Sequence, residues 1–258
     1  MKTIVLSFAC LLAVALLAAQ TTILPKTTVL PKTTAIAGGG AVTWTLAQHK
    51  ENFTCSGTGP TAACAATVTA LGAGHAAIVL STLFAQGTTP TFGSVAGDAG
   101  LTHCPAQLAA NQYSAGNWEA SDCAYATSLT GSGTTVTFTW AVQSGNSWNA
   151  DIEVLELVRS TGTATLETGG TQQTTSTCAT CTGPTPVVTG NADVVAVVNA
   201  NENDCTAVAS PYNTSPSPQV DNSNVFGIFG WSLSQTSANT ASYTCTSGGT
   251  AMSTVSFK

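Results

Sequence analysis

Hydrophobic and polar residues alternate along much of this chain. Between residues 134 and 142, Val136, Phe138, Trp140 and Val142 alternate with threonine and alanine. A period of two is typical of a β-strand with one buried face and one face near water. Alternating or short apolar runs, separated by clusters of Gly, Pro, Asn and Ser, predict strands at 42–47, 64–71, 75–84, 91–95, 134–142, 150–158, 163–168, 193–199, 225–233, 240–246 and 251–257.

The same pattern contains no helical period of useful length and no repeat of the kind that builds propellers or solenoids. We therefore expect an all-β fold, and a two-sheet antiparallel β-sandwich is its simplest architecture. Composition agrees with this, because the polar residues are mostly Thr, Ser, Asn and Gly, which favour strands and turns.

Charge is sparse: only 7% of the residues are charged and the formal net charge is −6. From Ala41 onward the cations are Lys50, Arg159 and Lys258. Because no basic patch is available to neutralise phosphates, nucleic acid is not an expected partner.

The first 40 residues differ from the rest of the chain. Residues 1–20 carry Lys2, an apolar stretch and a small-residue end, which predicts a signal peptide and a secreted, extracellular or cell-surface protein with no transmembrane segment after its removal. Residues 21–40 use the unit Leu-Pro-Lys-Thr-Thr twice and end in a glycine joint. We interpret them as a linker, with strand addition to a neighbouring copy as the alternative. Residues 41–258 form a single predicted β-sandwich domain.

Eight cysteines remain after the predicted signal, and an even number in an exported chain predicts four disulfides. Spacing does not determine the connectivity, but sequence order favours pairs that close short loops. Cys178 and Cys181, separated by two intervening residues, are interpreted as a structural bridge and not as a redox or zinc motif. The favoured pairs are Cys55–Cys64, Cys104–Cys123, Cys178–Cys181 and Cys205–Cys245.

The order of several segments resembles a jelly-roll module that recurs in secreted bacterial proteins. The resemblance rests on residues 73–80, 94–100, 134–140, 153–156, 190–196 and 255–258. It implies a jelly-roll-like sandwich with disulfide-tied loops, and such modules supply no activity that transfers to particular residues here.

Acidic residues gather in three local groups, and two carboxylates beside one cleft would indicate a glycosidase. Glu156 is expected on the same strand face as Ile152 and Val154, either protonated among apolar neighbours or bonded to backbone or to Arg159. The groups are Glu119/Asp122, Asp151/Glu153/Glu156 and Glu202/Asp204.

Two kinds of residue are candidates for binding a metal ion, the histidines and some of the acidic residues. His49, His75 and His103 are widely spaced, so a transition-metal site would require assembly of residues distant in sequence. Calcium binds oxygen ligands supplied by loops, and the candidate ligands are Asp98, Glu202 and Asp204. The alternative is that these residues belong to turns exposed to solvent and bind no ion. No other cofactor is predicted.

Four aromatic residues fall in segments interpreted as loops, where exposed rings would stack on sugars. They are Trp118, Trp148, Tyr113 and Tyr125. No catalytic residue is assigned. The leading hypothesis is a non-catalytic extracellular or cell-surface protein with a structural, adhesive or self-assembling role, whose partner is polysaccharide or copies of itself. A carbohydrate-binding module and a secreted polysaccharide hydrolase or lyase are the alternatives.

Overall fold

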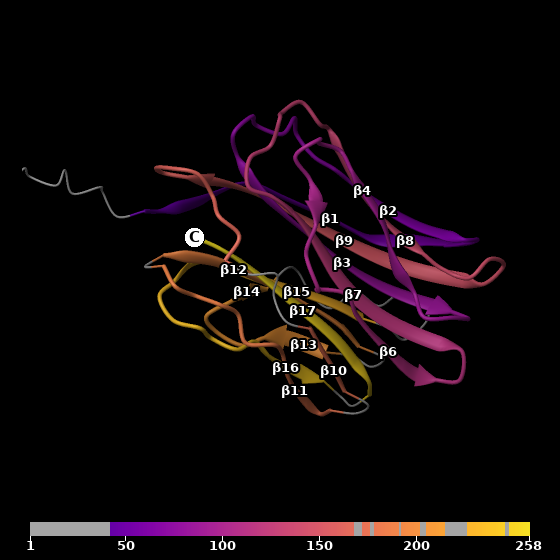
Figure 1. Cartoon of the computed structure of the whole chain (residues 1–258). Coiled ribbons are helices and arrows are strands. Elements are labelled where there is room, and N and C mark those ends of the chain that lie inside the picture. Colours follow the sequence, from indigo (N-terminus) through magenta and orange to yellow (C-terminus); the bar gives the residue numbers. More distant parts are fainter. Residues whose placement is uncertain are drawn as a thin grey trace, which may run out of the picture. The chain divides into compact units, whose positions relative to one another are not determined.

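The structure is a computed structural model that describes residues 42–167, 172–175, 178–190, 192–201, 205–214, 226–245 and 248–258 (Figure 1). These residues fall within one compact unit, Ala41–Lys258. Every regular element in the described ranges is a β-strand, and they contain no helix long and apolar enough to cross a membrane. The predicted signal peptide and linker lie outside the described residues.

The described strands form four sheets in which all neighbouring strands are antiparallel. Sheet A contains, in spatial order, β1 (Trp44–Thr58), β9 (Ser147–Arg159), β3 (Ala76–Gln86), β7 (Asn117–Ala126) and β5 (Thr102–His103), with β6 (Ala109–Ser114) also paired to β7. Sheet B contains β2 (Thr61–Thr67), β8 (Thr135–Ala141) and β4 (Thr91–Ala96). Sheet C contains β10 (Gln172–Thr175), β17 (Thr250–Phe257), β12 (Asp193–Asn201), β15 (Phe226–Gln235) and β14 (Asn213–Thr214). Sheet D contains β11 (Thr180–Thr182), β16 (Ser242–Cys245) and β13 (Cys205–Val208).

Three apolar clusters hold these sheets in a stack. Val79 and Phe138 belong to the cluster between sheets A and B. Ile78 and Phe229 belong to the cluster between sheets A and C. Tyr243 belongs to the cluster between sheets C and D. The predicted all-β antiparallel sandwich is therefore confirmed, and sheets B and D add an outer layer on each side of the central pair.

The position of a strand in the stack explains its residue pattern. β8 lies in an outer sheet, so Val136, Phe138 and Trp140 are fully buried while the intervening threonines keep some exposure. β12 lies in a sheet that is covered on both faces, and all nine of its residues are buried. Alternation therefore marks the outer strands, and continuous burial marks the inner ones.

The largest error of the strand prediction is β7, which the sequence pattern placed in a loop. It is an inner strand of sheet A, paired with β3 along its full length. Small residues such as Ala120 and Ala124 fill its face toward sheet B, and Ser121 Oγ lies 2.8 Å from Ser253 Oγ on its face toward sheet C. These residues have no strong strand preference, so packing decides the conformation. Of the predicted strand at 163–168, the described residues 163–167 form only an isolated bridge at Leu166.

All four predicted disulfide pairs are confirmed. Cys55–Cys64 closes the turn between β1 and β2, and Cys205–Cys245 joins β13 to β16. In sheet D two disulfides pack together, because Cys181 Sγ lies 3.5 Å from Cys245 Sγ. Sheet D is small, and these links stabilise it by restricting its unfolded states.

Candidate functional site

Each histidine of the chain lies beside a buried carboxylate that projects from sheet A. In two cases the contact is at hydrogen-bond distance: 2.5 Å between His75 Nδ1 and Glu156 Oε1, and 2.7 Å between His103 Nε2 and Asp122 Oδ2. His49 differs because it approaches two carboxylates at longer distances. The candidate site is therefore the His49 group, which consists of His49, Glu51 and Glu153.

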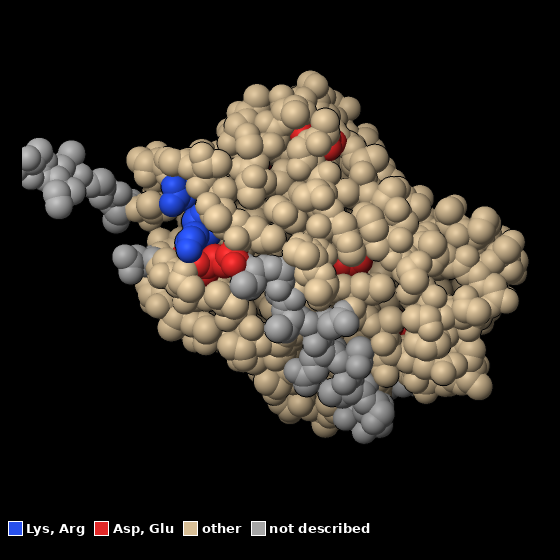
Figure 2. Space-filling model, viewed as in Figure 1, with Lys and Arg blue, Asp and Glu red and all other residues tan. Residues whose placement is uncertain are grey.

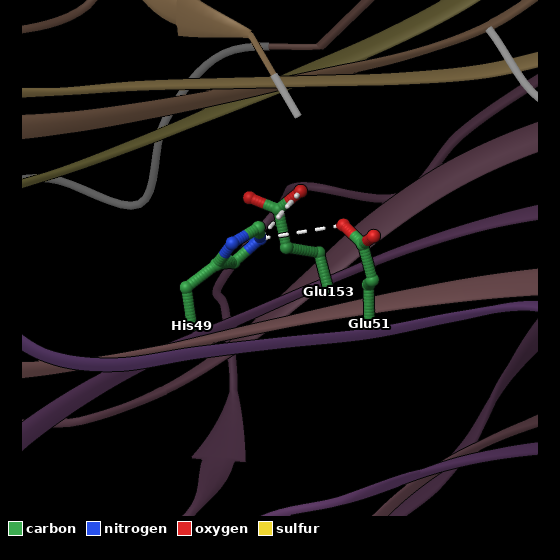
Figure 3. A group of neighbouring side chains, drawn as sticks. All are labelled: His49, Glu51 and Glu153. Atoms are coloured by element: carbon green, nitrogen blue, oxygen red, sulfur yellow. Dashed lines mark ion pairs between the residues drawn. The ribbon is translucent and has the colours of Figure 1, made fainter. Parts of the chain in front are cut away.

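The His49 group is built by two neighbouring strands (Figure 3). His49 and Glu51 stand two residues apart on β1, so they share a strand face, and Glu153 of β9 pairs directly with Glu51. His49 Nε2 lies 3.6 Å from Glu51 Oε2 and 3.5 Å from Glu153 Oε2. The Glu153 side chain is fully buried, whereas those of His49 and Glu51 are 21% and 30% exposed. Solvent therefore reaches the group past His49 and Glu51.

Neighbouring groups set the orientation and charge of His49. Its ring centroid lies 4.8 Å from that of Trp231 on β15, which places the imidazole against sheet C. Burial by itself lowers the pKa of His49, but Glu153 and Glu51 outweigh it, so that the pKa lies above the ordinary 6.5. The two carboxylates thus favour the protonated, cationic form of His49.

Glu156 is fixed by three donors at the other face of β9. It accepts hydrogen bonds from Gly72 N at 2.8 Å, from His75 and from Gln48 Nε2. The expected bond to backbone is confirmed, while the Arg159 guanidinium lies instead over Trp44, 5.8 Å from the ring centroid. Glu156 therefore joins β9 to the segment that precedes β3.

Alternation separates the acidic residues that are close in sequence. Asp122 binds His103, whose ring stacks at 3.9 Å on Phe92 of sheet B. Glu119 points to the opposite side of β7 and accepts a hydrogen bond from Asn111 Nδ2 at 2.8 Å. Burial raises the pKa of Asp122 above its usual value, although His103 and the Cys123 amide act in the opposite direction. Glu119 and Asp122 thus do not face a common cleft.

Asp98, a predicted calcium ligand, already accepts several internal donors. Its carboxylate receives the backbone N–H groups of Gly100, Thr130 and Gly131 and the Thr130 hydroxyl, all at 2.8–2.9 Å. Burial raises the pKa of Asp98, but these donors outweigh burial and hold it below 3.8. A cation would have to displace them. Glu202 and Asp204 lie outside the described residues, so calcium binding stays a prediction.

The four aromatic candidates do not form one exposed patch, and the prediction that they lie in loops is wrong. Trp148 belongs to β9, is 8% exposed and packs between sheets A and B. Tyr125 is partly buried and contacts Phe257 edge-on. Tyr113 and Trp118 are partly exposed on opposite faces of the same end of sheet A, because Tyr113 approaches Phe84 and Gly249 on the side of sheet C.

The sequence contained one signal for the His49 group that the strand prediction missed. The first strand was expected to end at residue 47, whereas β1 continues to Thr58. Extending it would have placed His49 and Glu51 on one face. Glu153, 102 positions after Glu51, comes into the group only through the β1–β9 register.

Comparison of the chain with protein-family models, with curated proteins and with solved structures finds no match. The function must therefore be argued from the residues themselves.

The pKa shifts predict a protein that is most stable in weak acid. The proton on His49 is held more tightly when folded, so its contribution is present below pH 6.5 and is lost as the pH rises through the folded pKa. The raised pKa of Asp122 likewise makes the folded chain less stable as the pH rises above 3.8. The lowered pKa values of Asp98 and Glu167 act oppositely, because their contributions are lost as the pH falls through the folded values.

We expect the free energy of unfolding, measured with urea, to be larger at about pH 5.5 than at about pH 8 and to fall again below about pH 3. His49 adds at most one proton to this dependence, which is about 1.4 kcal/mol per pH unit. The variant His49→Gln should flatten the curve between pH 6.5 and 8. Equal or greater stability at pH 8 than at pH 5.5 would contradict this assignment.

Proposed function

We propose that this chain is a non-catalytic protein of the cell surface or extracellular space, with a structural or adhesive role and with copies of itself as the principal partner. The observation that carries the proposal is that its prominent carboxylates serve as internal acceptors. Asp98 receives four donors and Glu156 three, and each of these residues joins segments distant in sequence. A catalytic acid or nucleophile has to reach a substrate, and these side chains are engaged in the fold.

The compartment is supported by the cysteines and by the amino-terminal sequence. Four disulfides persist in an oxidising environment, and residues 1–20 have the pattern of a signal peptide. Stacked sheets that carry four disulfides suit a protein that must persist outside the cell. We propose on the same grounds that it is a jelly-roll-like module of the secreted bacterial type.

A sparsely charged surface supports association between copies. On the face in Figure 2 uncharged residues dominate, and basic side chains lie beside acidic ones. Lys258 Nζ, for example, lies 3.3 Å from Glu167 Oε1. Neighbouring copies with so few charges repel one another weakly, which favours self-association through polar and apolar contacts.

Glycan binding is the second candidate, favoured by Trp118. This residue and Trp148 both pair with Ala85, so the two tryptophans share one face of sheet A. Trp118 Nε1 donates to Gly87 O at 3.1 Å, which fixes the partly exposed ring at the end of the sheet. A fixed, partly exposed indole is suited to stacking on a sugar.

The two candidates are separated by one set of measurements on the full mature chain. We expect light scattering to show a mean mass that rises with protein concentration, and incubation with neutral and acidic polysaccharides to release no new chain ends. Release of products that is abolished by Glu156→Gln would overturn the non-catalytic proposal. A monomer at every concentration that is retained by a polysaccharide gel, with retention lost in Trp118→Ala but kept in Tyr113→Ala, would establish glycan binding instead.

A further inference from the structure

We propose that His49, Glu51 and Glu153 form a binding site for one divalent transition-metal ion, with zinc as the ion that best suits the ligands. The site would hold β1, the edge strand of sheet A, to β9. This inference goes beyond the proposed function and does not depend on it, because a metal that joins two strands is compatible with a structural, an adhesive or a glycan-binding protein.

The spacing of the three ligand atoms carries the proposal. One atom from each residue can be chosen so that all lie within 4.8 Å of one another. Zinc binds nitrogen and oxygen at about 2.1 Å, and tetrahedral geometry then separates neighbouring ligands by about 3.4 Å. His49 Nε2 lies 3.6 Å and 3.5 Å from the two glutamate oxygens. The distance from the His49 nitrogen to each glutamate oxygen therefore matches the distance between two ligands of one zinc ion.

The other two histidines provide an internal comparison. His75 and His103 each approach one carboxylate, at 2.5 Å and 2.7 Å, which are distances of direct hydrogen bonds. His49 is placed almost equally far from two carboxylates of different strands, and both distances exceed those of the other pairs. Among the described residues, this is the one group of His, Cys, Asp and Glu side chains with metal-ligand spacing.

Ligand chemistry selects the class of ion. Imidazole is a ligand for zinc and other transition metals, whereas calcium and magnesium prefer sites made of oxygen atoms. Buried charges in proteins are paired or coordinate metals, and the fully buried carboxylate of Glu153 lies 3.5 Å from the His49 nitrogen. A metal ion between the three side chains would neutralise Glu153 and Glu51 together.

The surroundings of the group suit a site with one open position. Figure 3 shows the three side chains directed toward one another from β1 and β9. The ring of His49 rests against Trp231, which restricts its rotation before any metal arrives. Because His49 and Glu51 are partly exposed, an ion can enter from solvent and take water as its fourth ligand.

The test uses the full mature chain without a histidine tag, treated with chelator and titrated with Zn²⁺ in a calorimeter at about pH 7.5. We expect one ion per chain, and at least tenfold weaker binding at about pH 5.5, because the proton on His49 must leave before the nitrogen can bind metal. Ca²⁺ at the same concentrations should not compete for this site. Anomalous scattering from zinc-soaked crystals should place the ion beside Glu153.

Variants decide whether the bound ion belongs to this group. His49→Gln and Glu51→Gln change partly exposed side chains, and each should weaken zinc binding at least tenfold. Glu153→Gln alters a buried group and is judged only if its far-UV spectrum is unchanged. His75→Gln and His103→Gln are the matched controls and should bind zinc like the parent chain. Absence of binding, binding that survives both His49→Gln and Glu51→Gln, or equal losses in the control variants would each overturn the proposal.

Discussion

Replacement of Trp140 by alanine is expected to destabilise the folded chain by about 3–5 kcal/mol, the range for deleting a large buried aromatic side chain. Trp140 is fully buried between sheets A and B, and its ring centroid lies 5.3 Å from that of Phe138. Its indole N–H donates to Ser81 Oγ at 2.9 Å in the interior. The variant therefore loses apolar contacts and a buried hydrogen bond together, and urea unfolding followed by far-UV circular dichroism measures the loss.

The neighbouring Thr139 supplies the control, because it lies on the more exposed face of the same strand. Thr139→Ala should change the free energy of unfolding by less than about 1 kcal/mol. Trp140→Phe retains a ring but cannot donate to Ser81, and its loss should fall between those of the two alanine variants. Equal losses for Trp140→Ala and Thr139→Ala would show that the packing between sheets A and B is not as described.

Gly133→Ala is expected to destabilise the chain by about 1–3 kcal/mol, because the added methyl group overpacks a place where two backbone segments lie close together. A Cβ atom at residue 133 would lie 1.9 Å from Gly97 O and 3.3 Å from Leu71 Cδ1. The carbonyl of Gly133 also accepts a hydrogen bond from Leu71 N at 2.9 Å, so the backbone cannot retreat without losing this bond. Thermal and urea unfolding should both register the loss.

Gly183 provides the matched glycine. A Cβ atom there would meet its nearest neighbour, Ala241 O, at 3.5 Å, which is an ordinary contact. Gly183→Ala should therefore be neutral or stabilise by up to about 1 kcal/mol through the reduced freedom of the unfolded chain. A Gly133→Ala variant as stable as the parent would show that the segments carrying Gly133 and Gly97 do not pack as closely as described.

The candidate site could be predicted only in part. A strand that continued past residue 47 would have put His49 and Glu51 on one face, but no sequence pattern links them to Glu153. Trp148 shows the same limitation for aromatic residues. It follows Gly145 and Asn146, which indicated an exposed turn, yet it is the second residue of β9 and packs in a core. Whether a ring at a strand end is covered depends on which sheet lies over it.

The sequence by itself determined the all-β class and the outer strand β8 through hydrophobic alternation, and the order of the cysteines favoured the four disulfide pairs without determining them. Only the tertiary structure decided that four sheets stack, that β7 is an inner strand and that His49 meets Glu153. A strand covered on both faces loses its alternation, and the register between strands is set by packing across the whole sheet. Contacts between residues far apart in sequence therefore become visible only when the layers are assembled.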